Sequence, residues 1–217
     1  MINITLIDVL TIAMMATSLA VFSLRNLKWS VYAYIIQTLL LVSTFLLLAE
    51  KYHVEQLTKW AIIAFITKVV IVPYIILKLI KKLNVKYEET PLYGFFISPI
   101  IAMGFSLAMA MIISPILKEF SLLKETIPLI ASVTIFSLGI FGLILRKNVI
   151  KQILAYCLFE NGIHLTLALS AYNSPEIVDI GILTDAIFAV IIMSILAERF
   201  YKYFGALDVS KANQLKG

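Results

Sequence analysis

The sequence predicts an all-α integral membrane protein with seven transmembrane helices, its N-terminus outside and its C-terminus in the cytoplasm. Of the 217 residues, 61% are hydrophobic and only 14% are charged, and the mean hydropathy is +0.99. A water-soluble domain of this size cannot bury so much apolar surface. The apolar runs do not alternate as barrel strands do, and backbone polar groups in lipid must be satisfied within their own segment, so the runs are expected to be helices.

Seven apolar runs are long enough to cross a hydrocarbon core about 30 Å thick. They lie at about 4–24, 29–49, 57–79, 92–117, 126–145, 149–172 and 178–198. A polar stretch at 80–91 divides this single membrane domain, 1–217, into a three-helix part, 1–80, and a four-helix part, 92–198. A cytoplasmic tail is expected at 199–217. The first run has no basic region before it, so it predicts a permanent span and not a signal peptide.

The distribution of Lys and Arg predicts the orientation, because cytoplasmic loops carry an excess of these residues. One side of the predicted bundle carries thirteen of the eighteen cations, namely Arg25, Lys28, Lys78, Lys81, Lys82, Lys86, Arg146, Lys147, Lys151, Arg199, Lys202, Lys211 and Lys216. The opposite side carries four, namely Lys51, Lys59, Lys118 and Lys124. This split places the C-terminus in the cytoplasm and, with an odd number of spans, the N-terminus outside.

Two patterns concern how the helices pack. The run 92–117 carries small residues at four-residue spacing, Ala102, Ser106, Ala110 and Ser114, and such a ridge predicts close packing against a partner helix. The stretch 18–24, which precedes a basic turn, is echoed by 137–143, which precedes another. The echo suggests a duplication but is too short to establish one.

Ionisable residues inside the apolar runs are the candidate functional groups, because such residues in a membrane usually have a partner or a role. Glu160 lies eleven residues after Val149, roughly 16 Å along a helix at 1.5 Å per residue. Lys68 lies again near the middle of its run, and Asp185 lies about 10 Å inside the outer end of the last run. His164 follows Glu160 by four residues and shares its helix face. It is either a member of a proton relay or a core residue whose hydrogen bonds are satisfied.

Two interpretations of these residues are open. Glu160, Lys68, Asp185 and His164 could form a chain of proton-exchanging sites. Alternatively, Lys68 pairs with Glu160 or Asp185 in a structural ion pair, although buried pairs contribute little net stability. Pro73 cannot donate to the carbonyl of the fourth residue before it, so the helix is expected to be loosened beside Lys68, where water or a side chain can enter.

The chain offers few residues for redox chemistry. It has one cysteine, Cys157, and two histidines, His53 and His164. A disulfide within the chain and a cysteine-ligated metal or iron–sulfur centre are therefore excluded, and a haem held between helices is not expected. We expect no catalytic residues, no metal and no cofactor in this polypeptide, and no nucleic acid among its partners.

At this point the residues resemble a known family, hydrogenase-4 membrane component E, over nearly the whole chain. The stretches that carry the resemblance are 55–57, 64–69 with Pro73, 156–158, 160–162, 164–165, 179–182, 184–190 and 207–209. The resemblance implies a multi-pass membrane subunit, in the cell's inner membrane, of a group 4 nickel–iron hydrogenase complex such as a formate hydrogenlyase. Its partners would be antiporter-like subunits and the membrane anchor subunit.

The last three predicted helices, at about 126–198, are similar to the K-type small subunit of respiratory complex I and to the C-type subunit of multisubunit cation antiporters. The resemblance implies that Gly139 and Gly142, Arg146 and Asn148, and Glu160 match the glycine-bearing helix, the basic turn and the intramembrane Glu of those subunits. Asp185 would match their second acid. Glu160 lies about one helical turn later than that pattern has its glutamate, and Lys68 has no counterpart in a three-helix subunit.

These observations lead to one functional hypothesis and its alternatives. The chain is expected to be an accessory subunit whose proton-relay candidates, Glu160, Lys68, Asp185 and His164, contribute to H⁺ or Na⁺ translocation coupled to hydrogen metabolism. No catalytic activity is expected of it alone. The alternatives are a structural or assembly subunit that moves no ions, a subunit of a cation antiporter-like complex, and a stand-alone transporter, which the lack of an inverted repeat disfavours.

Overall fold

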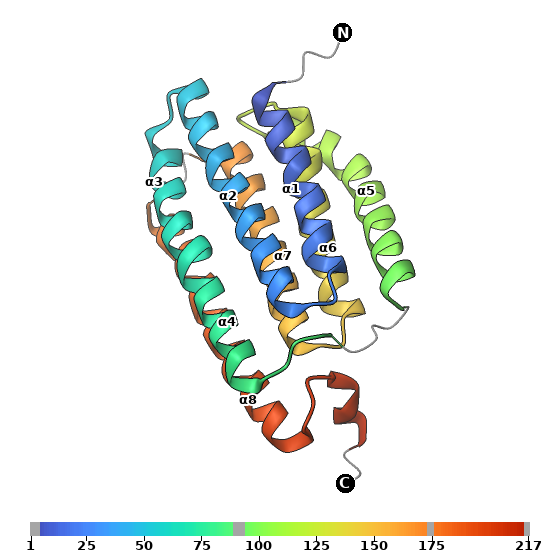
Figure 1. The fold of residues 1–217 in the computed structure, drawn as a ribbon. Helices are drawn as coiled ribbons and strands as arrows, with labels where there is room; N and C mark the ends of the chain where they lie inside the picture. The colour runs from blue at the N-terminus through green and yellow to red at the C-terminus, as the bar shows by residue number, and fades with distance from the viewer. Residues whose placement is uncertain (1–4, 89–93, 173–175, 215–217) are drawn as a thin grey trace.

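The computed structural model describes residues 5–88, 94–172 and 176–214, with the side chains of 176–184 and 212–214 left out. It is a bundle of long helices that run side by side (Figure 1). In the described part of the chain, six helical runs are long and apolar enough to cross a membrane, namely α1 Leu6–Ser23, α2 Leu27–Tyr52, the continuous run Glu55–Leu83, α5 Gly94–Phe120, α6 Thr126–Leu145 and α7 Val149–Ser170. α8, Glu176–Phe204, has 29 residues and occupies the place of the seventh predicted run. The predicted all-helical membrane-type fold is confirmed.

The third spanning run is interrupted near its middle. It consists of α3, Glu55–Ala64, a π-helical segment, Phe65–Ile71, and α4, Val72–Leu83. Lys68 is the central residue of the π-helical segment, and Pro73 follows it at the start of α4. Proline has no amide hydrogen, so the ordinary helical hydrogen bond at that position is lost. The predicted loosening of the helix beside Lys68 is therefore confirmed, and π-segments of this kind recur at functional sites.

The chain contains two three-helix units with matching connections. In the first, α1 and α2 are followed by α3–α4, and in the second, α6 and α7 are followed by α8. Asn26 and Asn148 cap the N-termini of α2 and α7 with their side-chain oxygens. Each asparagine also forms an isolated β-bridge with the extended chain after the third helix, Asn26 with Tyr87 and Asn148 with Asp208. The similarity between 18–24 and 137–143 in the sequence is therefore part of a similarity between two whole three-helix units, and α5 lies between these units in the chain.

The predicted linker at 80–91 and the predicted tail at 199–217 are each held by one of these bridges. In the stretch 80–91, α4 continues to Leu83, and the amide of Glu88 donates to the carbonyl of Arg25. The tail expected at 199–217 begins as the last turns of α8 and then returns, so that the amide of Val209 donates to the carbonyl of Lys147. Pairing satisfies backbone groups that would otherwise lie exposed at the ends of the helices.

The closest helix packing joins α6 and α7. A Cβ added to Gly139 would overlap the backbone of Phe159, and a Cβ on Gly162 would overlap the backbone of Phe136. Only glycine lets two helix backbones approach this closely. The small-residue ridge of α5 also packs within the chain, since Ala102, Ser106, Ala110 and Ser114 are buried and α5 lies against α6. The partner helix predicted for that ridge is therefore α6.

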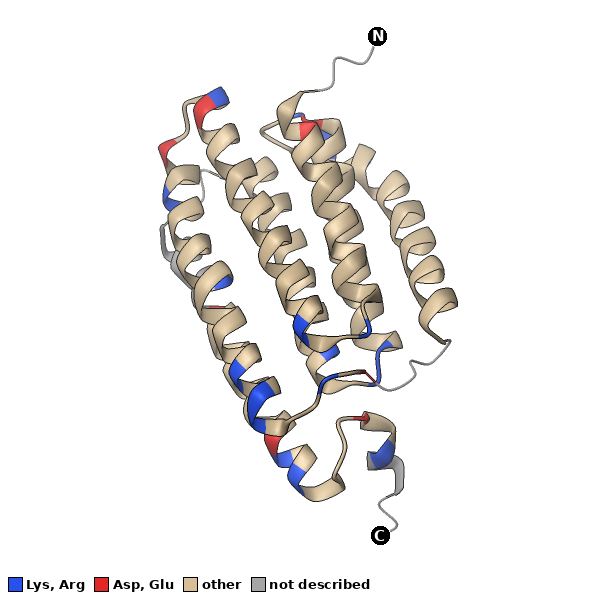
Figure 2. Ribbon diagram, viewed as in Figure 1, with Lys and Arg blue, Asp and Glu red and all other residues tan. Residues whose placement is uncertain are grey.

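Charged residues gather at the ends of the bundle, and most Lys and Arg lie at one end (Figure 2). This end, called the basic end below, contains the α1–α2 and α6–α7 turns and the C-terminal ends of α4 and α8 (Figure 1). The walls of the bundle between the two ends are almost free of charge (Figure 2). Large apolar side chains such as Phe96, Ile100 and Phe105 on α5 are exposed there, as is expected of surfaces that face lipid.

Gly139→Ala tests the close approach of α6 and α7. The added methyl group cannot be accommodated against the Phe159 backbone, so the helices must move apart, at a cost of roughly 1–3 kcal/mol. The melting temperature of the detergent-solubilised protein should fall. Gly104→Ala is the matched control, because a Cβ at Gly104 on α5 meets nothing within 4 Å. Equal melting temperatures for the two variants would contradict the packing described here.

Candidate functional site

The ammonium group of Lys68 contacts three side chains of α7, and Lys68 is 1% exposed. Lys68 Nζ lies 3.1 Å from Oε1 of Glu160, donates to Oδ1 of Asn161 at 2.9 Å and lies 2.7 Å from Nδ1 of His164. Asn161 and His164 lie in hydrogen-bond geometry with the ammonium, whereas Oε1 of Glu160 is an ion-pair neighbour that makes no hydrogen bond to the described residues. Sequence analysis left open whether Lys68 pairs with Glu160 or with Asp185. In the structure Lys68 pairs with Glu160.

Glu160 and His164 come from α7, one turn apart. Glu160 is buried, with 6% exposure, and its Oε1 lies 3.8 Å from His164 Nδ1. The same ring nitrogen lies 2.8 Å from the backbone carbonyl oxygen of Glu160. His164 Nδ1 therefore accepts a hydrogen bond when Lys68 is protonated, and it can donate to that carbonyl when the proton resides on the imidazole.

A second layer of polar groups joins the site to α2. The side-chain amide of Asn161 donates to Oε1 of Gln37 at 2.7 Å and to the hydroxyl of Thr38 at 3.3 Å. Sequence analysis did not name Gln37 or Thr38 and noted Asn161 only within the family motif. The amide side chain of Gln37 inside an apolar run was a signal that could have identified it, because an amide without hydrogen bonds is costly in hydrocarbon and therefore needs a partner.

The fourth sequence candidate, Asp185, lies apart from the ion pair. It is on α8, and its side chain is exposed on the surface of the chain. It is still near enough for its charge to act on Glu160 and on Tyr156. The structure therefore brings Lys68, Glu160 and His164 into contact and leaves Asp185 at the rim, within electrostatic range.

The site can exchange a proton internally without changing its net charge. Transfer from Lys68 to Glu160 converts an ammonium–carboxylate pair into a neutral amine and a carboxylic acid, over the 3.1 Å that separates them. Both forms avoid an isolated charge at a depth where such a charge is expensive. A site with two forms of equal net charge can pass a proton on or can simply hold the helices together.

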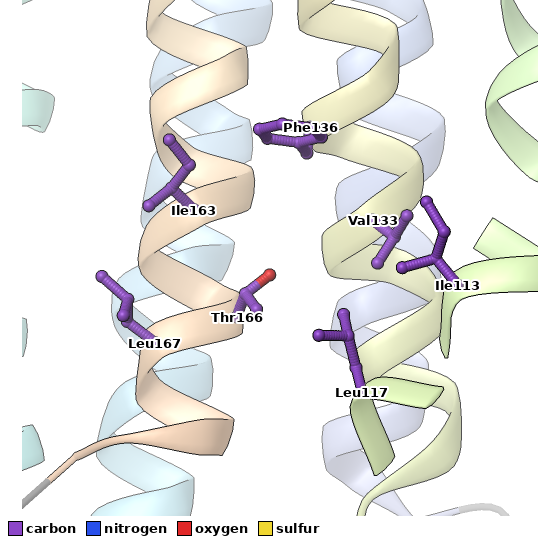
Figure 3. Close-up of a pocket in the computed structure, with 7 residues that line it drawn as sticks. All are labelled: Ile113, Leu117, Val133, Phe136, Ile163, Thr166 and Leu167. Carbon is purple, nitrogen blue, oxygen red and sulfur yellow. The ribbon is translucent and has the colours of Figure 1, made fainter. Parts of the chain in front are cut away.

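Among the described residues, no group of three or more His, Cys, Asp or Glu side chains could hold a metal ion. A cavity of about 230 Å³ lies between α5, α6 and α7. Figure 3 shows its lining, which is apolar except for Thr166, and includes Val133, Phe136 and Ile163. This cavity has no polar group suited to chemistry and takes no part in the Lys68 site.

Comparisons with known proteins identify the family. The chain is 38% identical over 205 residues to hydrogenase-4 component E of Escherichia coli (strain K12), and the match covers 94% of each chain. The protein of the same name from Shigella flexneri matches with the same identity and coverage. The chain belongs to the hydrogenase-4 component E family.

Residues 127–217 of this chain also match the family described as NADH-ubiquinone/plastoquinone oxidoreductase chain 4L. An uncharacterized protein of Mycobacterium tuberculosis is 26% identical over 148 residues, which are 67% of this chain and 66% of that protein. No solved structure matches the chain. The chain 4L match covers the unit of α6, α7 and α8 with Glu160, His164 and Asp185, whereas Lys68 lies outside it.

A second cluster of buried charged residues lies at the basic end and consists of Glu88, Arg146 and Lys151. Nη1 of Arg146 donates to Oε2 of Glu88 at 3.0 Å, and the guanidinium lies over the ring of Phe22, 4.2 Å from its centroid. Lys151 Nζ donates to the carbonyl of Val21 at 2.6 Å and to the hydroxyl of Ser30 at 2.8 Å. Two of the thirteen cations counted for the orientation, Arg146 and Lys151, are therefore buried and do not lie in solvent.

This cluster joins the two three-helix units, since Glu88 belongs to the first and Arg146 to the second. Burial raises the pKa of the Glu88 carboxyl, although the charges of Arg146 and Lys151 act in the opposite direction. Burial likewise lowers the pKa of the Arg146 guanidinium. Sequence analysis did not name Glu88, because an acid beside a predicted interface ordinarily lies in solvent.

Glu88→Ala should lower the stability of the folded chain strongly. It leaves the buried Arg146 charge without its carboxylate, and breaking one side of a buried pair costs about 3–5 kcal/mol. The measurement is the unfolding temperature in mild detergent. Glu198→Ala is the control, because its ion pair with Lys82 is exposed and such pairs contribute about 0–1 kcal/mol. A Glu88→Ala protein as stable as the Glu198→Ala protein would show that the cluster does not clamp the two units.

Proposed function

We propose that this protein is an accessory membrane subunit of a group 4 hydrogenase or formate hydrogenlyase-type complex, and that its Lys68–Glu160 site takes part in proton translocation. The family membership and the chain 4L match support a membrane subunit of a hydrogenase or complex I-like assembly. Antiporter-like subunits and the anchor subunit of such a complex are its proposed partners, and the inner cell membrane its proposed location.

The observation that carries the proposal is the position and composition of the Lys68 site. Glu160 lies eleven residues into α7, about 16 Å along an axis of roughly 33 Å. Lys68 meets it there from a π-helical segment, whose backbone is less constrained than an α-helix. Ionisable groups that approach within hydrogen-bonding distance at this depth mark proton pathways in membrane proteins.

The contacts favour H⁺ over Na⁺. A sodium ion would need the oxygens of Glu160 and Asn161, and both of these already face the Lys68 ammonium. Two cations sharing the same oxygens repel one another, and the repulsion is strong where the dielectric constant is low. A proton needs no such space, because it moves along hydrogen bonds that are already present.

Glu160→Gln tests the proposal directly. Gln keeps the shape and the hydrogen-bonding capacity of Glu but cannot titrate. The variant complex should assemble and turn over hydrogen, while proton movement in reconstituted vesicles falls on the order of a hundredfold, the scale of a lost positioned proton-transfer group. Glu50→Gln, at the exposed end of α2, is the control and should behave as wild type. Wild-type proton movement in Glu160→Gln would refute the relay.

A structural clamp is the second candidate function, and the buried ion pair of Lys68 with Glu160, together with the contacts of Lys68 to Asn161 and His164, favours it. Lys68→Met separates the two. In the clamp, removal of the ammonium strands a buried carboxylate, which is expected to cost about 3–5 kcal/mol, so the subunit should be lost from the complex. In the relay, Glu160 takes up a proton, the subunit stays, and only ion movement falls. Lys68→Met with Glu160→Gln should restore assembly if the pair is a clamp.

We also propose that the basic end faces the cytoplasm, with the N-terminus outside. The thirteen-to-four division of cations in the sequence supports this orientation. Reporter fusions after Leu83 and at the C-terminal end should report cytoplasm, and one at 173–177 should report the outside. A reporter at 173–177 that reads as cytoplasmic would overturn the orientation.

A further inference from the structure

Polar side chains follow the interface of α2 and α7 from the Lys68 site towards the basic end. On α2 they are Ser30, Tyr34 and Thr38, at four-residue spacing, so they lie on one face of the helix. On α7 they are Lys151, Cys157 and Asn161, all buried. Polar residues buried at this spacing between two apolar helices are costly unless they contact one another.

The contacts link these residues to the ion pair. Tyr34 and Cys157 are buried on the facing sides of α2 and α7, and the hydroxyl of Thr38 donates to the backbone carbonyl of Tyr34 at 3.0 Å. Thr38 accepts from Asn161, which in turn accepts from Lys68. At the other end, Ser30 accepts from Lys151. Ser30 and Tyr34 are one turn apart on the same face of α2, so water is needed to connect their hydroxyls.

The basic end of this interface also carries buried polar atoms that attract water. Nε and Nη2 of Arg146 and Oε1 of Glu88 are buried and make no hydrogen bond to the described residues. Buried polar atoms of this kind are usually satisfied by ordered water. Water at this cluster would lie next to Lys151 and Ser30, where the polar side chains begin.

The other half of the same interface is apolar. Beyond Thr38, the buried face of α2 continues with Leu41, Phe45 and Leu48, and that of α7 beyond His164 with Leu165 and Leu169. Thr44 is the exception on this face, and its hydroxyl bonds to the carbonyl of Leu40 on its own helix and to the sulfur of Met14. Among the side chains that the structure describes, the polar contacts of the Lys68 site therefore continue along the α2–α7 interface towards the basic end.

We infer that the Lys68–Glu160 site exchanges protons with the compartment at the basic end through the α2–α7 interface, and that the hydroxyl of Tyr34 is the relay group that connects the two. This inference rests on the proposed function and adds a direction to it. A hydroxyl can accept one proton while it donates another, so Tyr34 passes a proton between water near Ser30 and Thr38 without becoming charged. The amide of Asn161 holds Thr38 beside the ion pair and does not itself carry the proton. Oε1 of Glu160 and Nε2 of Gln37 are buried without a hydrogen bond to the described residues, so the last transfer, from Thr38 to Glu160, takes place through water held at these two atoms. No other bond forms or breaks, and rotation of the hydroxyls restores the starting arrangement.

Tyr34→Phe tests the inference, because it retains the buried ring and removes only the hydroxyl. In the reconstituted complex, the variant should assemble normally, move protons roughly tenfold more slowly, since proton transfer by a positioned group contributes at least that much, and show a larger solvent deuterium isotope effect because proton delivery now limits the rate. Thr38→Val should have the same two effects through the next residue in the chain of contacts.

Two control variants make the result specific. Tyr32→Phe removes a hydroxyl from the exposed face of α2, and Thr44→Val removes one from the apolar half of the interface, and both should match wild type. If Thr44→Val slows proton movement as much as Tyr34→Phe, the assigned direction is wrong. If Tyr34→Phe and Thr38→Val match wild type while Glu160→Gln is slow, the pathway is wrong and the proposed function stands. If Glu160→Gln also matches wild type, the proposed function fails too.

Discussion

The ammonium group of Lys68, buried at mid-depth and shared by Glu160, Asn161 and His164, is the interaction on which the rest of this structure depends. A charge at this depth is stable only if its partners are already in place. Its partners come from α7, and Asn161 is in turn held by Gln37 and Thr38 of α2. The packing of these three segments is thus the condition for the site, and the site in turn fixes their register.

The break in the third spanning run follows from the same constraint. The lysine lies in a π-helical segment, Phe65–Ile71, that ends just before Pro73. Proline removes a backbone donor, and the wider turn allows a different rotation of the helix before and after it. Lys68 therefore points into the bundle, while Phe65 and Ile66 in the same segment remain exposed on the apolar surface.

The two matching units contribute to the site from different helices. Lys68 belongs to the third helix of the first unit, and Glu160, Asn161 and His164 belong to the second helix of the second unit. The units are tied at the basic end by Glu88, Arg146 and Lys151, and α6 meets α7 through glycines that let their backbones touch. The chain 4L match covers only the second unit, so the first unit provides the lysine that a lone three-helix unit would lack.

The sequence by itself determined the helical membrane-type fold, the family and the identity of the candidate residues. Hydropathy and length decide the fold and the candidate residues, because lipid permits few backbone arrangements and makes each intramembrane charge conspicuous. The family follows from the matching stretches of residues. It also indicated the weak helix at Pro73. Only the tertiary structure decided that Lys68 pairs with Glu160 while Asp185 stays exposed, and that Gln37, Tyr34 and Glu88 belong to buried polar clusters. Those outcomes depend on the rotation and spacing of helices far apart in the sequence, which side-chain packing sets and which no local pattern of residues encodes.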